Sequence, residues 1–362
     1  MKKTTQKPAK TGLRSWGAVL GLSLMTMQAP ASTLITGQLE AGTPRDVVHE
    51  LVEKLGYTES GPCTLVSLER EDEKFAREVF FRAECDSEKL FLKFDSWGVA
   101  QAFRPVVSLL ESSPLLSRSV LKPIAEFSFR REGRESDPED YCGAYPWIAG
   151  DTLEDLVGKV HQPEQEAEYL EGLYRQVGEV IGEMHRIGLV DADQPLPEMQ
   201  SGLVHRDLHG GNVKITPDNR IVVLDIDSFV VPEKPQPVLE FVLDDVINLV
   251  VMVERNNFLT NSPRVSAWLS VLPGVAEAML TSYCQTLVGK DKAAVCVSRI
   301  AEQLPERIEM EYQNAVNFLR ERMEEGKAEG TEEQLDDEQW IESVASEQEI
   351  KCRLEVVLGL LR

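Results

Sequence analysis

Several features that define whole classes of protein are scarce in this sequence. No apolar run reaches the roughly 18 residues that a membrane span needs, so we predict no stable span. The six cysteines include no Cys-x-x-Cys pair, and no His-Glu-x-x-His motif or Cys/His cluster indicates zinc. We interpret the cysteines mostly as buried thiols, with a disulfide framework as the alternative.

Basic residues are also few compared with acidic residues. The chain has 38 Lys and Arg against 61 Asp and Glu, a formal net charge of −23. Such a field repels phosphate, so we expect no nucleic-acid partner. With 362 residues, 42% of them hydrophobic, the chain is long enough for two domains or one two-lobed domain. The oligomeric state cannot be derived from the composition.

Acidic residues are absent from residues 1–39, which carry five Lys or Arg. The apolar run Trp16 to Met27 and then Ala29-Pro30-Ala31 follow, a layout typical of a signal peptide. The alternatives are a disordered basic leader, or residues upstream of a true start at Met25 or Met27. We assign residues 1–42 to this leader.

Short apolar or β-branched stretches dominate residues 43–148. We predict a helix over 43–55, strands over 64–68, 78–83 and 89–94, a helix over 96–110, and strands over 121–129 and 141–148. Residues 149–320 have mainly helical spacing, with helices over 152–160, 173–184 and 244–253 and short strands over 213–215 and 221–224. Residues 321–362 form a predicted acidic helical tail, with eleven acidic side chains in 324–349.

The most informative stretch is residues 203–229, LVHRDLHGGNVKITPDNRIVVLDIDSF. It contains His205-Arg206-Asp207, then Asn212 five residues after the Asp, then Asp225 after an apolar strand. This pattern matches the catalytic signature of kinases. The sequence therefore resembles the protein-kinase-like superfamily, in particular its aminoglycoside/choline phosphotransferase branch. The resemblance implies an α+β fold with a small β-rich N-lobe (43–148) and a larger α-helical C-lobe (149–320).

The resemblance also implies ATP and Mg²⁺ as cofactors and gives each motif residue a role. Asp207 would be the catalytic base and Arg206 its neighbour in the motif, expected to bind a local carboxylate. Asn212 and Asp225 would ligate the metal, because hard oxygen ligands suit Mg²⁺. Asp227 is a second carboxylate nearby, either a further metal ligand or the cap of the next turn.

Upstream, a kinase needs a strand lysine for the phosphates and a helix glutamate that holds it. We predict Lys93 and Glu111 for these roles, with Glu88, Lys89 and Asp95 as rivals on neighbouring positions. Trp147 and Ile148, in the segment between the lobes, are predicted to meet the nucleotide base.

Three further residues are expected to support the loop or the core. Asp245, with Asp244 as the alternative, resembles the family's carboxylate at a helix start that braces the catalytic loop. His209 is predicted to make a structural hydrogen bond in the loop. His185 is predicted to be a core histidine.

The spacing favours a small-molecule kinase. Only 20 residues separate Asp225 from Asp245, which leaves no room for a peptide-docking activation segment, and the metal motif is Asp-Ile-Asp rather than Asp-Phe-Gly. We therefore predict a phosphotransferase that moves the γ-phosphate of ATP to a hydroxyl of a small molecule. The alternatives are a protein Ser/Thr kinase, possibly exported, and a pseudokinase, because residues 69–77 contain no glycine where the phosphate loop is expected. A cytoplasmic location is expected for an ATP-dependent enzyme, with export as the alternative.

Overall fold

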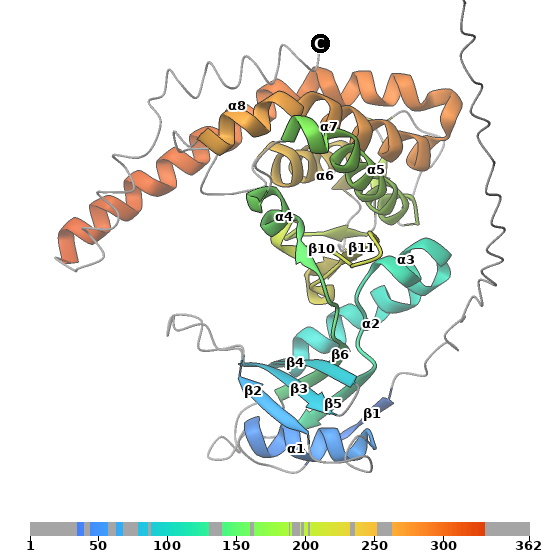
Figure 1. Ribbon diagram of the computed structural model, residues 1–362, viewed down its shortest axis with the longest axis vertical. Coiled ribbons are helices and arrows are strands. Elements are labelled where there is room, and N and C mark those ends of the chain that lie inside the picture. Colours follow the sequence, from blue (N-terminus) through green and yellow to red (C-terminus); the bar gives the residue numbers. More distant parts are fainter. Residues whose placement is uncertain are drawn as a thin grey trace, which may run out of the picture. The chain divides into compact units, whose positions relative to one another are not determined.

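In the computed structural model the described part of the chain comprises residues 35–39, 44–56, 63–67, 79–85, 88–129, 140–159, 163–187, 189, 196, 199–201, 203–231, 236–251 and 263–329 (Figure 1). All of it belongs to one compact unit, Leu34–Arg362. None of the helices in these ranges is long and apolar enough to cross a membrane.

A six-stranded sheet is built from the first part of the chain, in the order β1-β5-β6-β4-β3-β2. Its strands are β1 (Ile35–Gln38), β2 (Thr64–Ser67), β3 (Val79–Cys85), β4 (Glu88–Ser96), β5 (Ala125–Phe129) and β6 (Asp140–Pro146). Strand β1 pairs with β5 in parallel, and the other neighbours are antiparallel. The antiparallel part is what short strands joined by short connections are expected to form.

The alternation of side chains along β4 gives the sheet two different faces. Leu90, Leu92 and Phe94 are buried on one face, in a core that they share with helix α1 (Pro44–Lys54). Phe91 and Lys93 point to the other face, where Phe91 packs against the second and larger core. The sequence of β4 therefore places its lysine on the face opposite α1.

Helix α1 packs on the sheet because its apolar residues recur at helical spacing. Val47, Val48, Leu51 and Val52 are all buried in the core beneath it. The helix ends at Gly56, whose φ of 78° is a left-handed conformation that glycine adopts without strain.

Two helices connect β4 to β5. Helix α2 (Trp97–Ser112) is followed by α3 (Pro114–Ser119), whose N-cap Ser113 accepts a hydrogen bond from the Leu116 backbone N–H. The Ser113 hydroxyl also donates to Glu183 at 2.7 Å, which ties this connection to helix α5 (Pro163–Ile187).

Three short sheets surround the kinase-like motif. Strand β10 (Val213–Ile215) pairs with β11 (Ile221–Val223) and with β7 (Asp151–Thr152). Strand β9 (Val204–His205) pairs with β12 (Phe229–Val230), and β8 (Gln200–Ser201) with β13 (Gln236–Pro237). The β9–β12 pair places the segment after Asp225 beside the segment before Asp207.

The remaining described chain is mostly helical. It comprises α4 (Leu153–Lys159), α5, α6 (Val238–Val246) with a π-helical turn (Ile247–Val251), α7 (Pro263–Val288) and α8 (Lys290–Glu329). Helices α5 and α7 approach closely at Gly178, where an added Cβ would lie within 3.0 Å of the Met279 carbonyl group.

Three predictions from the sequence are corrected by the structure. Strand β1 lies inside the segment assigned to the leader, so the folded unit begins earlier than residue 43. Helix α6 starts at Val238 and not at Asp244. Four cysteines form the disulfides Cys63–Cys85 and Cys284–Cys296, and Cys142 alone matches the prediction of a buried thiol. Residues 330–362 of the predicted tail, and residues 69–77, lie outside the described residues, as does Cys352.

Candidate active site

An ion-pair cluster joins β4 to the segment that follows β11. The Lys93 ammonium donates to Asp225 Oδ1 at 2.9 Å and to Asp227 Oδ2 at 2.6 Å. The Lys93 side chain is only 8% exposed, so its water shell has largely been replaced by the two carboxylates. A cation and two anions held this closely, and mostly away from water, interact strongly.

The two carboxylates differ in their acidity. Burial acts against the charged form of Lys93, but Asp227 and Asp225 outweigh it and raise the pKa of the ammonium. Burial also acts against Asp225, yet Lys93 and the Ser228 hydroxyl lower the pKa of this carboxyl to about 2. Burial and the neighbouring charge of Asp225 raise the pKa of Asp227 to about 6. Asp225 is therefore the firmly ionised member of the pair.

Asp225 also has an unusual backbone. Its φ of 56° and ψ of 59° lie in the left-handed region, which Asp tolerates better than most residues. The next turn is closed by a hydrogen bond from the Ser228 N–H to the Asp225 carbonyl, at 3.0 Å, and the Ser228 hydroxyl donates to Asp225 Oδ2 at 2.7 Å. Such a conformation at a charged residue is typical of functional sites.

The loop that holds Asp207 is fixed by its own side chains. The Asn212 amide donates to the Asp207 carbonyl at 2.8 Å, and the Asp207 N–H donates to His205 Nδ1 at 3.2 Å. His205 Nε2 lies 3.2 Å from the Leu224 carbonyl, so this nitrogen carries the proton. Burial lowers the pKa of His205 to about 4, which keeps the ring neutral and this pattern intact.

His209 acts inside the same loop. Its Nδ1 accepts the Gly211 N–H at 3.1 Å, and its Nε2 lies 3.7 Å from Asp207 Oδ2. The first contact agrees with the predicted structural hydrogen bond. The Asp207 side chain itself is 51% exposed, so an acceptor can reach its carboxylate from solvent.

A cavity of about 330 Å³ connects most of the predicted site residues. Its lining includes the three ion-paired residues and Asn212, and also Trp147, Ile148 and Lys214. The remaining lining is apolar or aromatic: Phe80, Phe91, Leu121, Tyr145, Pro146, Leu224 and Ile226. A flat, largely apolar wall with a charged end suits a planar ring that carries phosphates.

The backbone of Trp147 is only partly available to a ligand. Its N–H donates to the Lys89 carbonyl at 3.0 Å, which extends the β4–β6 pairing by one residue. Lys89 lies near the start of β4, and its side chain pairs with Glu84. Of the strand lysines considered, Lys93 is therefore the one that lines the cavity.

Two of the predicted metal ligands have a side-chain oxygen atom that is available to bind a cation. Asp227 Oδ1 is buried and has no hydrogen-bond partner, and Asn212 uses its amide nitrogen and leaves Oδ1 available. The described residues include no cluster of three or more His, Cys, Asp or Glu, so the donor set is two carboxylates and an amide. This set fits Mg²⁺, which takes few protein ligands and keeps several waters.

Glu111 is not the partner of Lys93. It lies near the end of α2, 51% exposed, and its carboxylate accepts from Lys122 at 3.4 Å. The predicted Lys93–Glu111 pair is thus wrong, because Asp225 and Asp227 occupy the lysine. Glu126 is a buried acid in line with Lys93 across the sheet. In the strand pairing, Lys93 lies opposite Gly143, and Gly143 lies opposite Glu126. Glu126 has no motif around it that could have revealed it.

Asp245 lines one cavity together with His205, Arg206 and Leu208 of the Asp207 loop, beside which the sequence predicts it. It lies in the last turn of α6, buried, with Oδ2 3.7 Å from His185 Nε2. His185 is buried as predicted, and its Nδ1 lies 3.0 Å from the Tyr283 hydroxyl. Arg206 lies exposed beside a second cavity, of about 300 Å³, which Asp244 and Asp245 also line.

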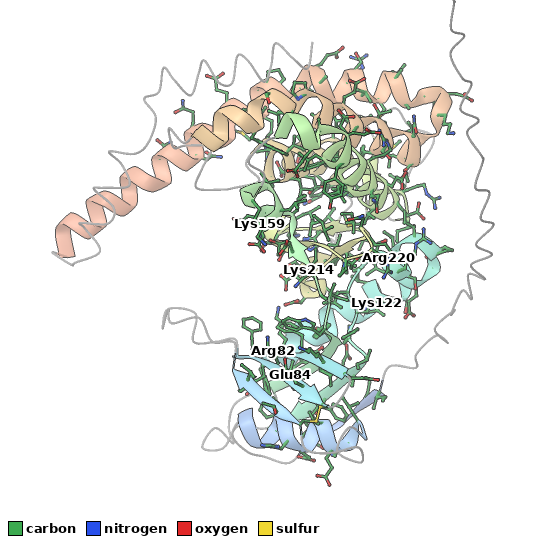
Figure 2. All side chains as sticks on the ribbon, in the orientation of Figure 1. Arg82, Glu84, Lys122, Lys159, Lys214 and Arg220 are labelled. Carbon is green, nitrogen blue, oxygen red and sulfur yellow. A yellow bond between two sulfur atoms is a disulfide. The ribbon has the colours of Figure 1, made fainter. Side chains whose placement is uncertain are left out.

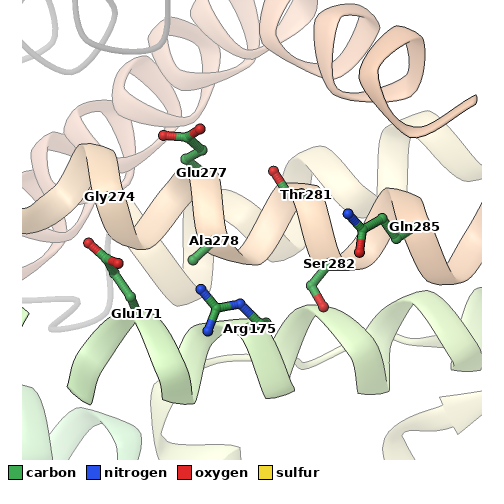
Figure 3. A pocket seen from close by; sticks show the side chains of 8 residues that line it. All are labelled: Glu171, Arg175, Gly274, Glu277, Ala278, Thr281, Ser282 and Gln285. Carbon is green, nitrogen blue, oxygen red and sulfur yellow. The ribbon is translucent and has the colours of Figure 1, made fainter. Parts of the chain in front are cut away.

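A third cavity, of about 350 Å³, lies between α5 and α7 (Figure 3). Glu171 and Arg175 reach into it from α5, and the other lining residues belong to α7. None of the kinase-like motif residues lines it. Its chemistry is that of a polar groove between two packed helices.

Comparisons with known proteins add little to this geometry. No protein-family model matches the chain, and no curated protein matches it. A solved structure described as "WaaP in complex with acyl carrier protein" aligns at a TM-score of 0.40 and 13% identity, over 74% of this chain and 98% of that chain. The mixed architecture, a sheet region with several helices, is compatible with a kinase-like fold.

Proposed function

We propose that the protein is a phosphotransferase that moves the γ-phosphate of a nucleoside triphosphate, ATP by resemblance, to a hydroxyl group of a small molecule. The observation that supports this best is the juxtaposition of Lys93 with Asp225 and Asp227 at one end of the cavity. Asp225 and Asp227 are 132 and 134 positions from Lys93 in sequence. The resemblance implies phosphate binding for Lys93 and metal binding for Asp225, with Asp227 as a further metal ligand or the cap of the next turn.

Each residue has a defined part in this reaction. Asn212 Oδ1, Asp225 and Asp227 would hold Mg²⁺, which neutralises charge on the phosphates when bound. Lys93 would exchange its carboxylate partners for phosphate oxygens. Asp207, held by Asn212 and His205, would orient the acceptor hydroxyl and take its proton. The hydroxyl oxygen forms a bond to the γ-phosphorus while the bond to the β-phosphate oxygen breaks, and the nucleoside diphosphate leaves.

A small acceptor is supported by the short connection after Asp225. Helix α6 begins at Val238, so residues 226–237 are all that lies between the two. Part of that connection already pairs with other strands, through β12 and β13. A peptide-docking platform of the protein-kinase type would need a longer segment.

The test is binding and turnover in the full chain, with water as the surrogate acceptor. We expect Asp207→Ala to lower phosphate release from Mg·ATP by about 10²- to 10⁴-fold with little change in nucleotide affinity. Asp225→Ala should weaken nucleotide binding itself, seen as loss of the Mg²⁺-dependent thermal shift. Asp218→Asn, an exposed change in the neighbouring turn, is the control. Full activity in both site variants would refute the assignment.

A further inference from the structure

The cavity has a second cation that the phosphate chemistry does not use. Lys214, which is labelled in Figure 2, lines the same cavity as the Lys93 cluster. Its ammonium lies 5.3 Å from the centre of the Trp147 ring. Lys93 is saturated by two carboxylates, whereas no ion pair of Lys214 with another described residue is found. Among the described residues that line the cavity, Lys214 is thus the cation without an ion pair.

The environment of Lys214 explains why a ligand would be attracted to it. The Lys214 side chain is half-buried, and the carboxylates whose charges act on its ammonium are those of Asp155 and Asp151. Both carboxylates are engaged elsewhere: Asp151 accepts from Lys159 at 2.7 Å, and Asp155 accepts from the Thr152 N–H. A partly desolvated donor with no acceptor of its own gains most from an acceptor that the ligand brings.

The hydrogen-bonding groups of guanine and adenine determine which nucleotide Lys214 would favour. Guanine presents two adjacent acceptors, O6 and N7, which lysine and arginine recognise in proteins. Adenine presents N7 beside its 6-amino group, a donor that would face the donor of Lys214.

We propose that the cavity prefers guanine over adenine nucleotides, with Lys214 as the residue that determines this specificity. This inference rests on the proposed function, because it needs the phosphates at the Lys93 end and the base at the Trp147 end. It replaces the adenine nucleotide implied by resemblance with a guanine nucleotide as the better phosphate donor.

Arg82 provides a matched control. It also places a cation over the Trp147 ring, with Cζ at 5.5 Å, but it comes from β3 and does not line the cavity (Figure 2). It has a carboxylate of its own, Glu84, at 3.2 Å. Replacing Arg82 therefore changes the charge near Trp147 without removing a donor from the cavity.

The experiment measures dissociation constants of Mg·GTP and Mg·ATP for the full chain by calorimetry, with non-hydrolysable analogues as a check. We expect GTP to bind at least about tenfold more tightly than ATP. Lys214→Met should bring the two affinities within about twofold. Lys214→Gln should shift the preference toward ATP, because glutamine pairs with the N6/N7 edge of adenine. Arg82→Gln should leave the ratio unchanged.

The outcomes separate this inference from the function on which it rests. Equal or tighter binding of ATP by the unmodified chain overturns the guanine preference and leaves the proposed phosphotransferase intact. A GTP preference that survives in both Lys214 variants shows that another residue sets it, and also overturns the inference. If neither nucleotide binds, both proposals fail.

Discussion

At the scale of single residues, Lys93 holds together two carboxylates that would otherwise repel each other. All three side chains are mostly buried, so removing the cation leaves two anions with little water to compensate them. The stability of the unliganded protein should therefore depend on Lys93 as strongly as its nucleotide binding does.

We predict that Lys93→Met lowers the free energy of unfolding by roughly 3 kcal/mol. Urea denaturation at neutral pH without nucleotide measures this loss. The matched control is Lys122→Met, which breaks the half-exposed pair with Glu111 and should cost less than about 1 kcal/mol. Equal losses in the two variants would mean that the Lys93 cluster is no more than a surface ion pair.

The residue scale also shows what the sequence could reveal about the site. Asp207, Asn212, Asp225 and Lys93 were predicted because motif spacing or an apolar strand pointed to them, and the structure brings the last three to one cavity. The prediction for Glu111 is wrong because helix α2 places its carboxylate beside Lys122. No sequence pattern indicates that two aspartates pair with Lys93 instead. Lys214 could have been suspected, as a charged residue alternating with Val213 and Ile215 in a short strand.

At the scale of elements, the close approach of α5 and α7 depends on glycine. A Cβ at Gly178 would lie 2.2 Å from the Met279 carbonyl oxygen, a backbone atom that cannot turn aside. Six residues earlier along α5, nearly two helical turns, the contact is absent, because nothing lies within 4 Å of a Cβ at Gly172. The same substitution should thus have opposite effects at the two positions.

We predict that Gly178→Ala destabilises the protein by about 2 kcal/mol or more through overpacking. Gly172→Ala should stabilise it by up to about 1 kcal/mol, because alanine is the better helix former. Thermal unfolding of both variants under one buffer condition checks the pair. Stabilisation by both would show that the two helices can move apart without cost.

Elements were predicted most accurately where periodicity was strong. The predicted helix at 43–55 and the strands at 64–68 and 89–94 agree with α1, β2 and β4 to within about two residues. The start of α6 was missed by six residues because paired acidic residues at 244–245 imitate a helix N-terminus. Strand β1 was missed because its partner β5 lies 90 residues further on, and local sequence carries no sign of that pairing.

At the scale of the whole molecule, two disulfides each close a short loop of the described chain. Cys63–Cys85 closes a separation of 22 residues and Cys284–Cys296 one of 12. Loops of this length should stabilise the fold by about 3 kcal/mol each. Disulfides persist in oxidising compartments. Together with the signal-like residues 1–39, they lead us to propose export rather than a cytoplasmic location.

Thiol labelling of protein recovered from cells tests this proposal. After denaturation without reductant, an alkylating reagent should modify Cys142 and leave the four paired cysteines unmodified. Prior reduction should expose all six cysteines of the chain, Cys352 included, and lower the melting temperature of the native protein. Full labelling of Cys63 and Cys85 without reductant would place the protein in a reducing compartment and contradict export.

The Lys93 cluster has one more consequence, for association kinetics. One ammonium between two carboxylates leaves the charged end of the cavity with no spare positive charge, in a chain of formal charge −23. A nucleoside triphosphate therefore approaches against the field of the protein rather than along it. Added salt shortens the range of that repulsion. Stopped-flow measurements should show the association rate constant rising with ionic strength, the reverse of the behaviour of electrostatically steered enzymes.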